Sequence, residues 1–145
     1  MTGIRPLRPT ETADTIFEID FDRLYSKGRR ALLFDLDNTL GRRGMEHLDD
    51  RILPFLLSLE ERGLRVGILT NRRRNAEGPA MEALRRHFPV IHGARKPARS
   101  GFLELLGALH ASPREAVMIG DRRWTDILGA NRLGIHSIRV RSRAR

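Results

Sequence analysis

The 145-residue chain has no cysteine, which excludes disulfide bonds and metal sites built from thiolates. It also contains no run of about 18 consecutive apolar residues, so no transmembrane helix is expected. Residues 1–15 are polar and contain proline, without an apolar stretch that could export or anchor the protein. We therefore expect a soluble, cytoplasmic protein that begins with a flexible segment over residues 1–15.

Lysine is scarce. Of the 27 basic residues only Lys27 and Lys96 are lysine, and the others are all arginine. The formal net charge of +9 points to a nucleic acid, an acidic membrane or an anionic substrate as a partner. An arginine excess can equally reflect genome composition, so a solvated basic surface without a partner remains an alternative.

Short apolar runs of strand length recur along the chain, and helical patterns follow them. Continuous apolar runs of this kind are typical of strands buried on both faces of a parallel sheet. The expected strands are Ala31–Leu36, Val66–Thr70, Val90–Ile91, Ala116–Ile119 and Ser137–Val140.

Apolar residues between these runs repeat at helical spacing. The stripes are Ile52, Phe55, Leu56 and Leu59; Met81, Leu84 and Phe88; Phe102, Leu105, Leu106 and Leu109; and Ile127, Leu128 and Leu133. Alternation of strand and helix predicts an α/β fold: a single Rossmann-like domain over residues 1–145, with a five-stranded parallel sheet and helices on both faces. Residues 141–145 are expected to form a basic tail.

Polar residues follow four of the expected strands. In open parallel sheets ligands bind at the carboxyl ends of the strands, so we expect these side chains to converge on one edge. In chain order they are Asp35 and Asp37, then Thr70 and Asn71, then Lys96, then Asp121 and Asp126.

The residue types at this edge indicate phosphoryl chemistry. Asp35 ends a hydrophobic strand, where a carboxylate is costly unless it is paired or binds a metal. Several carboxylates together would repel one another, and a hard divalent cation such as Mg²⁺ would relieve that repulsion, with Asp35, Asp37, Asp121 and Asp126 as candidate ligands. Asp35 could then attack phosphorus while Asp37 transfers the proton.

Three further residues suit the binding of a phosphoryl group. Thr70 offers a hydroxyl donor, Asn71 lies beside it, and Lys96 offers a compact positive charge. Retention of lysine at position 96 in so arginine-rich a chain supports that role. For Asp126 an alternative remains, because an aspartate at this position could simply cap the final helix.

The segments LFDLDNTL, LTN, RKP and GDRRWTD together resemble the four motifs of the haloacid dehalogenase-like superfamily, over about residues 16–140. The resemblance implies that Asp35 is the nucleophile and a metal ligand, and that Asp37 is the acid/base residue and gives its main-chain carbonyl to Mg²⁺. It also implies that Thr70 and Lys96 hold the phosphate and that Asp121 binds the metal. Asp126 would support the metal through water or orient Lys96. The second aspartate of the first motif, Asp37, favours phosphoryl over halide chemistry.

In detail, the sequence resembles the YqeG-like branch of subfamily IIIA, which includes phosphatidylglycerophosphate phosphatases. The pieces that carry it are Ala94-Arg95-Lys96-Pro97 and the run from Gly120-Asp121 to Gly134. Two stretches depart from the branch pattern, Gly41-Arg42-Arg43-Gly44 and Arg122-Arg123. A phosphorylated lipid headgroup is therefore the expected substrate, and a soluble sugar or nucleotide phosphate is the alternative.

Only about ten residues separate the first expected strand from the first expected helix, and the link between the second and third strands has the length of a helix. Neither link can hold a cap domain, so we expect an open site that suits large or membrane-borne substrates. Nine arginines on the strand-end loops form what we call the arginine rim. They are Arg42, Arg43, Arg72, Arg73, Arg74, Arg95, Arg99, Arg122 and Arg123.

The arginine rim suggests peripheral contact with an anionic membrane, at the inner membrane surface, or attraction of a polyanionic substrate. An alternative from another class is a basic nucleic-acid-binding module that uses the same arginines. We do not expect a nucleic-acid partner. A catalytically idle scaffold is a third alternative, which the intact acidic set disfavours. Trp124 is expected to pack beside the site rather than to stack on substrate.

Overall fold

The computed structural model describes residues 5–42, 44–73 and 78–141. Six strands form one parallel sheet in the order β1-β6-β5-β2-β3-β4. The strands are β1 (Glu11–Ala13), β2 (Ala31–Phe34), β3 (Arg65–Leu69), β4 (Val90–Ile91), β5 (Ala116–Gly120) and β6 (His136–Val140). The expected parallel α/β sheet is confirmed, but the expected count of five strands is wrong.

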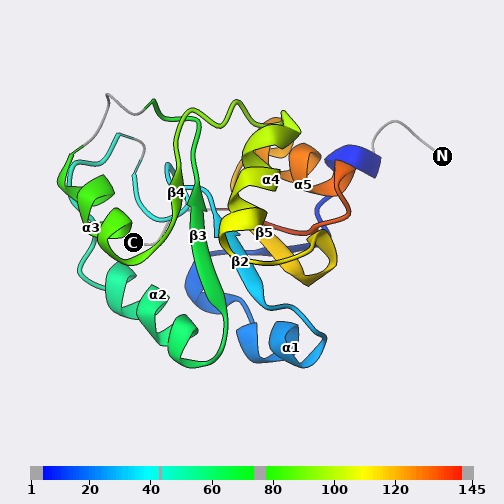
Figure 1. The fold of residues 1–145 in the computed structure, drawn as a ribbon, viewed down its shortest axis with the longest axis horizontal. Helices are drawn as coiled ribbons and strands as arrows, with labels where there is room; N and C mark the ends of the chain where they lie inside the picture. The colour runs from blue at the N-terminus through cyan, green and yellow to red at the C-terminus, as the bar shows by residue number, and fades with distance from the viewer. Residues whose placement is uncertain (1–4, 43, 74–77, 142–145) are drawn as a thin grey trace.

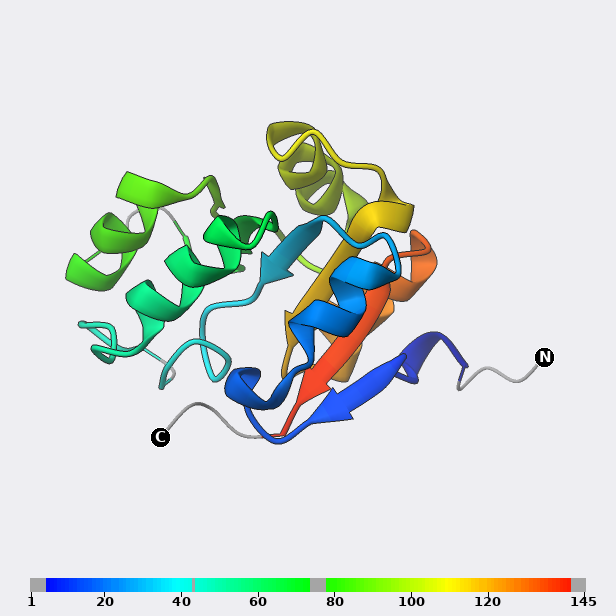
Figure 2. The ribbon, with the colours of Figure 1, turned by 90° about the horizontal axis from the view of Figure 1, so that it is seen from below.

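The additional strand β1 lies in the segment that we expected to be a flexible start. It pairs in parallel with β6, with Glu11 opposite Ile138 and Ala13 opposite Val140, and Figure 2 shows the two strands side by side. Side-chain hydrogen bonds support this pairing, because the main-chain N–H of Thr10 donates to Oγ of Ser137 at 3.0 Å. Residues 142–145 of the expected basic tail lie outside the described residues.

Helices cover both faces of the sheet (Figures 1 and 2). They are α1 (Phe21–Ser26), α2 (Ile52–Glu61), α3 (Pro79–His87), α4 (Arg99–Ala108) and α5 (Leu128–Arg132). The four expected amphipathic stripes lie in α2, in α3, in α4 and at the η4–α5 junction, where η4 (Arg123–Ile127) is a short π-helical segment. Helix α1 was not expected from the sequence.

Side-chain alternation along β2 sends successive residues to two separate cores. Leu32 and Phe34 pack with α1, α2 and α3, whereas Ala31 and Leu33 pack with α4 and α5. All four residues are fully buried, which explains why the strand is apolar without interruption. The first core is larger because three helices contribute to it.

The chain order places β2 at the point where the sheet changes direction. From β2 the chain continues to β3 and β4 on one side, and β5 and β6 then lie on the other side. A crevice opens outside the carboxyl ends of the strands at such a switch point. Asp35 follows β2 directly and therefore lies in the middle of this edge.

The link from β2 to α2 covers residues 35–51, which is longer than expected because β2 ends at Phe34 rather than Leu36. Apart from residue 43, these residues form turns and bends, with an isolated bridge between Asp37 and Gly41. The described part of this link contains no additional helix or strand of the kind that builds a cap.

No helix among the described residues is both long enough and apolar enough to cross a membrane.

The two faces of α4 provide a matched test of the packing. Leu105 is fully buried and contacts β3 at Gly67, whereas Leu103 in the same helix is 48% exposed. We expect Leu105→Ala to lower the free energy of unfolding by about 2–5 kcal/mol and Leu103→Ala to change it by less than about 0.5 kcal/mol. Urea denaturation of the two variants measures this difference, and equal losses would contradict the assigned helix faces.

Candidate active site

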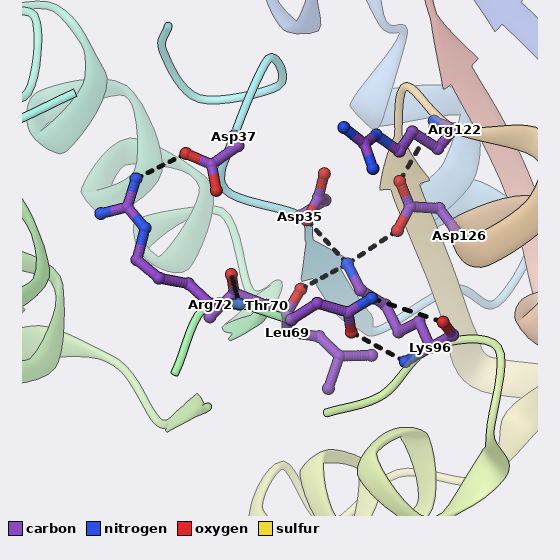
Figure 3. Close-up of polar contacts among 9 residues, drawn as sticks. Asp35, Asp37, Leu69, Thr70, Arg72, Lys96, Arg122 and Asp126 are labelled. Atoms are coloured by element: carbon purple, nitrogen blue, oxygen red, sulfur yellow. Dashed lines mark hydrogen bonds and ion pairs between the residues drawn. The ribbon is translucent and has the colours of Figure 1, made fainter. Parts of the chain in front are cut away.

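Asp35, Lys96 and Asp126 form a buried ionic cluster at the carboxyl edge of the sheet (Figure 3). The ammonium of Lys96 donates from Nζ to Oδ1 of Asp35 at 2.7 Å, to Oδ1 of Asp126 at 2.7 Å and to the carbonyl oxygen of Leu69 at 2.8 Å. An ammonium has three N–H donors, so these three contacts use its full capacity. Together with the Leu69 carbonyl, the cluster joins four separate segments of the chain.

Burial controls the ionisation of this cluster. Asp35 is 7% exposed, and burial raises its pKa to about 7 against the opposing effect of the Lys96 ammonium. Burial alone would lower the pKa of Lys96, but the carboxylates of Asp126 and Asp35 outweigh it and raise that pKa above its ordinary value. The lysine therefore stays charged, while the nucleophile candidate is held near the point where it loses its proton.

Asp126 is fully buried and lies within η4, so the alternative of a simple helix cap is wrong. Its Oδ1 accepts from Lys96 and its Oδ2 accepts from the main-chain N–H of Arg122 at 3.2 Å. Both oxygens are therefore engaged, and the residue fixes the position of the Lys96 ammonium. Asp126 lies in a π-helical segment, and such segments occur frequently at functional sites.

Asp121 completes a group of three carboxylates. One oxygen from each of Asp35, Asp121 and Asp126 lies within 4.8 Å of the others. Oδ1 of Asp121 is buried and has no hydrogen-bond partner among the described residues, and burial, followed by the charge of Asp126, raises the pKa of this carboxyl. A buried acceptor without a donor, beside two other acids, fits a hard divalent cation with oxygen ligands.

Asp37 has a separate environment from these three acids. Its Oδ1 accepts from the main-chain N–H of Gly44 at 2.9 Å and from Nη2 of Arg72 at 2.5 Å. Asn38, with φ of 64°, turns the chain sharply after Asp37. The carboxyl group of Asp37 is therefore not part of the three-carboxylate group, and its expected metal contact through the main-chain carbonyl stays a prediction.

Thr70 and Asn71 follow β3 and meet the Lys96 loop. Oγ1 of Thr70 accepts from the main-chain N–H of Arg72 at 3.0 Å, which leaves the hydroxyl proton free to donate. Asn71 accepts at Oδ1 from the main-chain N–H of Lys96 at 2.7 Å, and its Nδ2 donates to the Lys96 carbonyl at 3.4 Å. Asn71 thus fixes the loop that carries the lysine, a role that its position in the sequence did not indicate.

A cavity of about 220 Å³ opens onto these groups. Its lining residues are Asp35, Asp37, Thr70, Asn71, Arg72, Lys96, Arg122 and Thr125. Five of the seven residues expected at the site line it directly, and the other two, Asp121 and Asp126, each have a carboxylate oxygen within 4.8 Å of one of Asp35. Sequence analysis did not single out Thr125 as a lining residue, nor the Arg72 contact with Asp37.

The nine arginines of the arginine rim do not all lie around the cavity among the described residues. Arg43 and Arg74 lie outside the described residues, and Arg73 lines a separate depression beside β4. Arg42, Arg95, Arg99, Arg122 and Arg123 are exposed, and Arg72 and Arg122 line the cavity. Trp124 is 69% exposed rather than packed beside the site, so that expectation is wrong.

Comparison with known proteins now identifies the family. Residues 15–134 match the haloacid dehalogenase-like hydrolases. The chain is similar to "Probable phosphatase YqeG" of Bacillus subtilis, with 31% identity over 91% of this chain and 76% of that protein. It is also similar to "Phosphatidylglycerophosphate phosphatase 1, chloroplastic" of Chlamydomonas reinhardtii, with 31% identity over 91% of this chain, which spans about half (52%) of that protein's length.

Among solved structures, an uncharacterised protein from Listeria monocytogenes has the same fold, with a TM-score of 0.63 and 23% identity over 77% of this chain and 78% of that one. The chain belongs to the haloacid dehalogenase-like hydrolase family. The recognition made from its four motifs is confirmed.

Removal of the buried ammonium tests the electrostatics of the cluster. We expect Lys96→Met to lower the free energy of unfolding by about 3–5 kcal/mol at pH values above 7, because it leaves buried carboxylates without a counter-charge. The Lys96 charge lowers the pKa of Asp35, so the variant's carboxyl takes up its proton more readily. A carboxyl whose pKa is raised by folding stabilises the fold as the pH falls, so the variant should recover part of its stability on acidification.

Urea unfolding at several pH values measures this effect. Lys27→Met, which removes the only other lysine from an exposed position, is the matched control and should show no such pH dependence. Equal stability of the two variants at all pH values would contradict the assigned role of Lys96.

Gly120 provides a steric test, because a Cβ at this position would lie 2.2 Å from Oδ2 of Asp126. Gly120→Ala must displace Asp126 and with it the Lys96 ammonium, and we expect a loss of about 1–3 kcal/mol from the free energy of unfolding. Gly107→Ala in α4, where a Cβ has open space, is the control and should be neutral or stabilising. Calorimetric Tm values compare the two, and an unchanged Gly120→Ala variant would contradict the close approach.

Proposed function

We propose that this protein is a Mg²⁺-dependent phosphomonoester hydrolase that works through an aspartyl-phosphate at Asp35, with phosphatidylglycerophosphate as its best substrate candidate. Membership of the hydrolase family and the phosphatase names of its relatives support phosphatase chemistry itself. The observation that carries the proposal is buried Asp35, which accepts a hydrogen bond from Lys96 and faces a cavity that is also lined by a second, differently held carboxyl, Asp37.

In the first step a carboxylate oxygen of Asp35 attacks phosphorus, and the bond from phosphorus to the substrate's ester oxygen breaks. Asp37 transfers its proton to the departing oxygen, so the product leaves as an alcohol. In the second step Asp37 takes a proton from water, and the resulting hydroxide displaces the Asp35 carboxylate from phosphorus. Inorganic phosphate is released and both aspartates return to their starting forms.

The remaining residues hold the phosphoryl group and its charge. Thr70 has a hydroxyl proton available to a phosphoryl oxygen, and Lys96 provides positive charge beside Asp35. Asp35, Asp121 and Asp126 would hold the cation, since their oxygens lie close together. When bound, a divalent cation supplies positive charge against the phosphoryl oxygens.

The lipid substrate is supported by the similarity to the chloroplastic phosphatase and by the open edge of the site. Exposed Trp124 lies between Arg123 and Thr125 at this edge, and tryptophan with neighbouring arginines suits the interface of an anionic membrane. We infer that the exposed members of the arginine rim and Trp124 bring the cavity to the membrane surface.

The catalytic roles are tested by phosphate release from Asp35→Asn, Asp37→Asn and Asp50→Asn, with and without a chelator. We expect no activity above background for Asp35→Asn, since the nucleophile is lost. For Asp37→Asn we expect kcat to fall by about 10²–10⁴-fold. Asp50 is exposed and lies outside the four motifs and the cavity lining, so its variant is the control.

Chelation should abolish the wild-type activity, and added Mg²⁺ should restore it. An active Asp35→Asn enzyme would refute the phosphoaspartate route. A panel of phosphatidylglycerophosphate, sugar phosphates and nucleoside monophosphates at equal concentration identifies the substrate class. Preference for a soluble ester would favour a sugar or nucleotide phosphate as substrate over the lipid. Salt-sensitive binding of nucleic acid that Asp35→Asn does not affect would favour the nucleic-acid-binding module.

The fluorescence of Trp124 can report membrane contact, because Trp124 is the only tryptophan in the sequence. We expect its fluorescence to shift to the blue with vesicles that contain phosphatidylglycerol and to stay unchanged with phosphatidylcholine alone. The shift should disappear near about 1 M salt, where the Debye length is about 3 Å. Identical spectra with and without anionic vesicles at low salt would contradict peripheral binding.

A further inference from the structure

The cavity contains more positive charge than the transferred phosphoryl group requires. Lys96 and the free hydroxyl proton of Thr70 already face that group, and the three carboxylates fit a cation. Two guanidinium groups, those of Arg72 and Arg122, line the cavity in addition. Their presence needs an explanation beyond the phosphoryl group itself.

Figure 3 shows the two arginines on different sides of Asp35, with Arg72 next to Asp37. The side chain of Arg72 is only 12% exposed, although it carries a charge that would prefer water. Its Nη2 donates to Oδ1 of Asp37 at 2.5 Å, and among the described residues this is the only partner of its guanidinium. A guanidinium has five N–H donors, so donors remain for a second acceptor.

The contact with Asp37 locates Arg72 relative to the reaction. In a displacement at phosphorus the ester oxygen leaves opposite the attacking oxygen of Asp35, and Asp37 delivers the proton to that leaving oxygen. Because Arg72 is bound to Asp37, it lies on the side of the departing alcohol. Its remaining donors are therefore available to a group that the alcohol carries.

The same contact also leaves one oxygen of Asp37 available. Oδ1 accepts from Gly44 and from Arg72, so it is held by two donors. The transferable proton is then best placed on Oδ2, which has no donor among the described residues. Arg72 thus orients the acid/base group while its remaining N–H groups stay free.

We propose that Arg72 is a specificity-determining residue that recognises a second anionic group, a phosphodiester or carboxylate, on the alcohol portion of the substrate. A planar guanidinium can bind such a group through two parallel hydrogen bonds, which a lysine could not do. The inference rests on the proposed phosphomonoester hydrolysis and narrows its substrate class to esters with two anionic groups. It applies to a soluble headgroup as well as to a lipid, because the cavity meets only the headgroup.

The test compares two soluble substrates that differ in the second anion. One is glycerol 3-phosphate, and the other is glycerophosphoglycerophosphate, in which a phosphodiester neighbours the hydrolysed monoester. The ratio of kcat/KM for the two substrates is measured on a single preparation, so it does not depend on how much of a variant is folded. Both substrates lack acyl chains, so membrane binding does not contribute.

We expect the wild type to favour the phosphodiester-containing substrate by about tenfold or more, as is typical of a charge-assisted hydrogen bond. Arg72→Gln should bring the ratio close to one, largely through KM for that substrate, and Arg72→Lys should retain part of the preference. Any fall in kcat common to both substrates reports the orientation of Asp37 and leaves the ratio unchanged.

Neighbouring arginines provide matched controls. Arg73→Gln removes the same charge from the adjacent position outside the cavity and should leave the ratio as in the wild type. Arg122→Gln removes a guanidinium from the other side of Asp35 and should affect both substrates equally. Loss of the preference in Arg122→Gln but not in Arg72→Gln would overturn the assignment, as would equal preference in the wild type.

The outcomes separate the two proposals. Hydrolysis of neither substrate by the wild type would refute the phosphatase proposal together with the role of Arg72. Hydrolysis of both substrates, with a ratio that Arg72→Gln does not change, would refute the role of Arg72 alone.

Discussion

A single buried ammonium connects the parts of this site. Lys96 contacts Asp35 after β2, Asp126 in η4 and the carbonyl of Leu69 at the end of β3. One positive charge between two carboxylates leaves a net negative charge, to which Asp121 adds. Because a low-dielectric environment strengthens such an imbalance, the cluster suits one more cation.

Individual residues near the cluster hold its charged groups in position. Gly120 leaves room for Asp126, and Asn71 fixes the backbone of Lys96 through two hydrogen bonds. Asn38 adopts a left-handed conformation that turns the chain between Asp37 and the next buried residue. Each of these residues acts on the position of a charged group.

Much of this architecture could be predicted from the sequence, because the strands are buried on both faces and their apolar runs are unambiguous. The convergence of the candidate site residues on one edge could be predicted as well, since each follows a strand and the strands are parallel. Strand β1 could not, because Glu11, Thr12 and Ala13 form a short polar edge strand whose pairing depends on β6, far away in the chain. The contact between Arg72 and Asp37 joins two loops, and the sequence indicated only that both residues lie at the same edge. The exposure of Trp124 depends on the π-helical turn that carries it, and apolar spacing does not predict such a turn.

The pairing of β1 with β6 has a consequence for how the protein is made. Glu11 lies opposite Ile138, so β1 pairs with a strand that is synthesised after all the other described strands. The central strands and their helices can assemble during translation, but this edge closes only after synthesis has passed β6. Until then β1 has no strand to pair with among the described residues, and the flank of β5 that β6 will occupy is open to chaperones and to self-association.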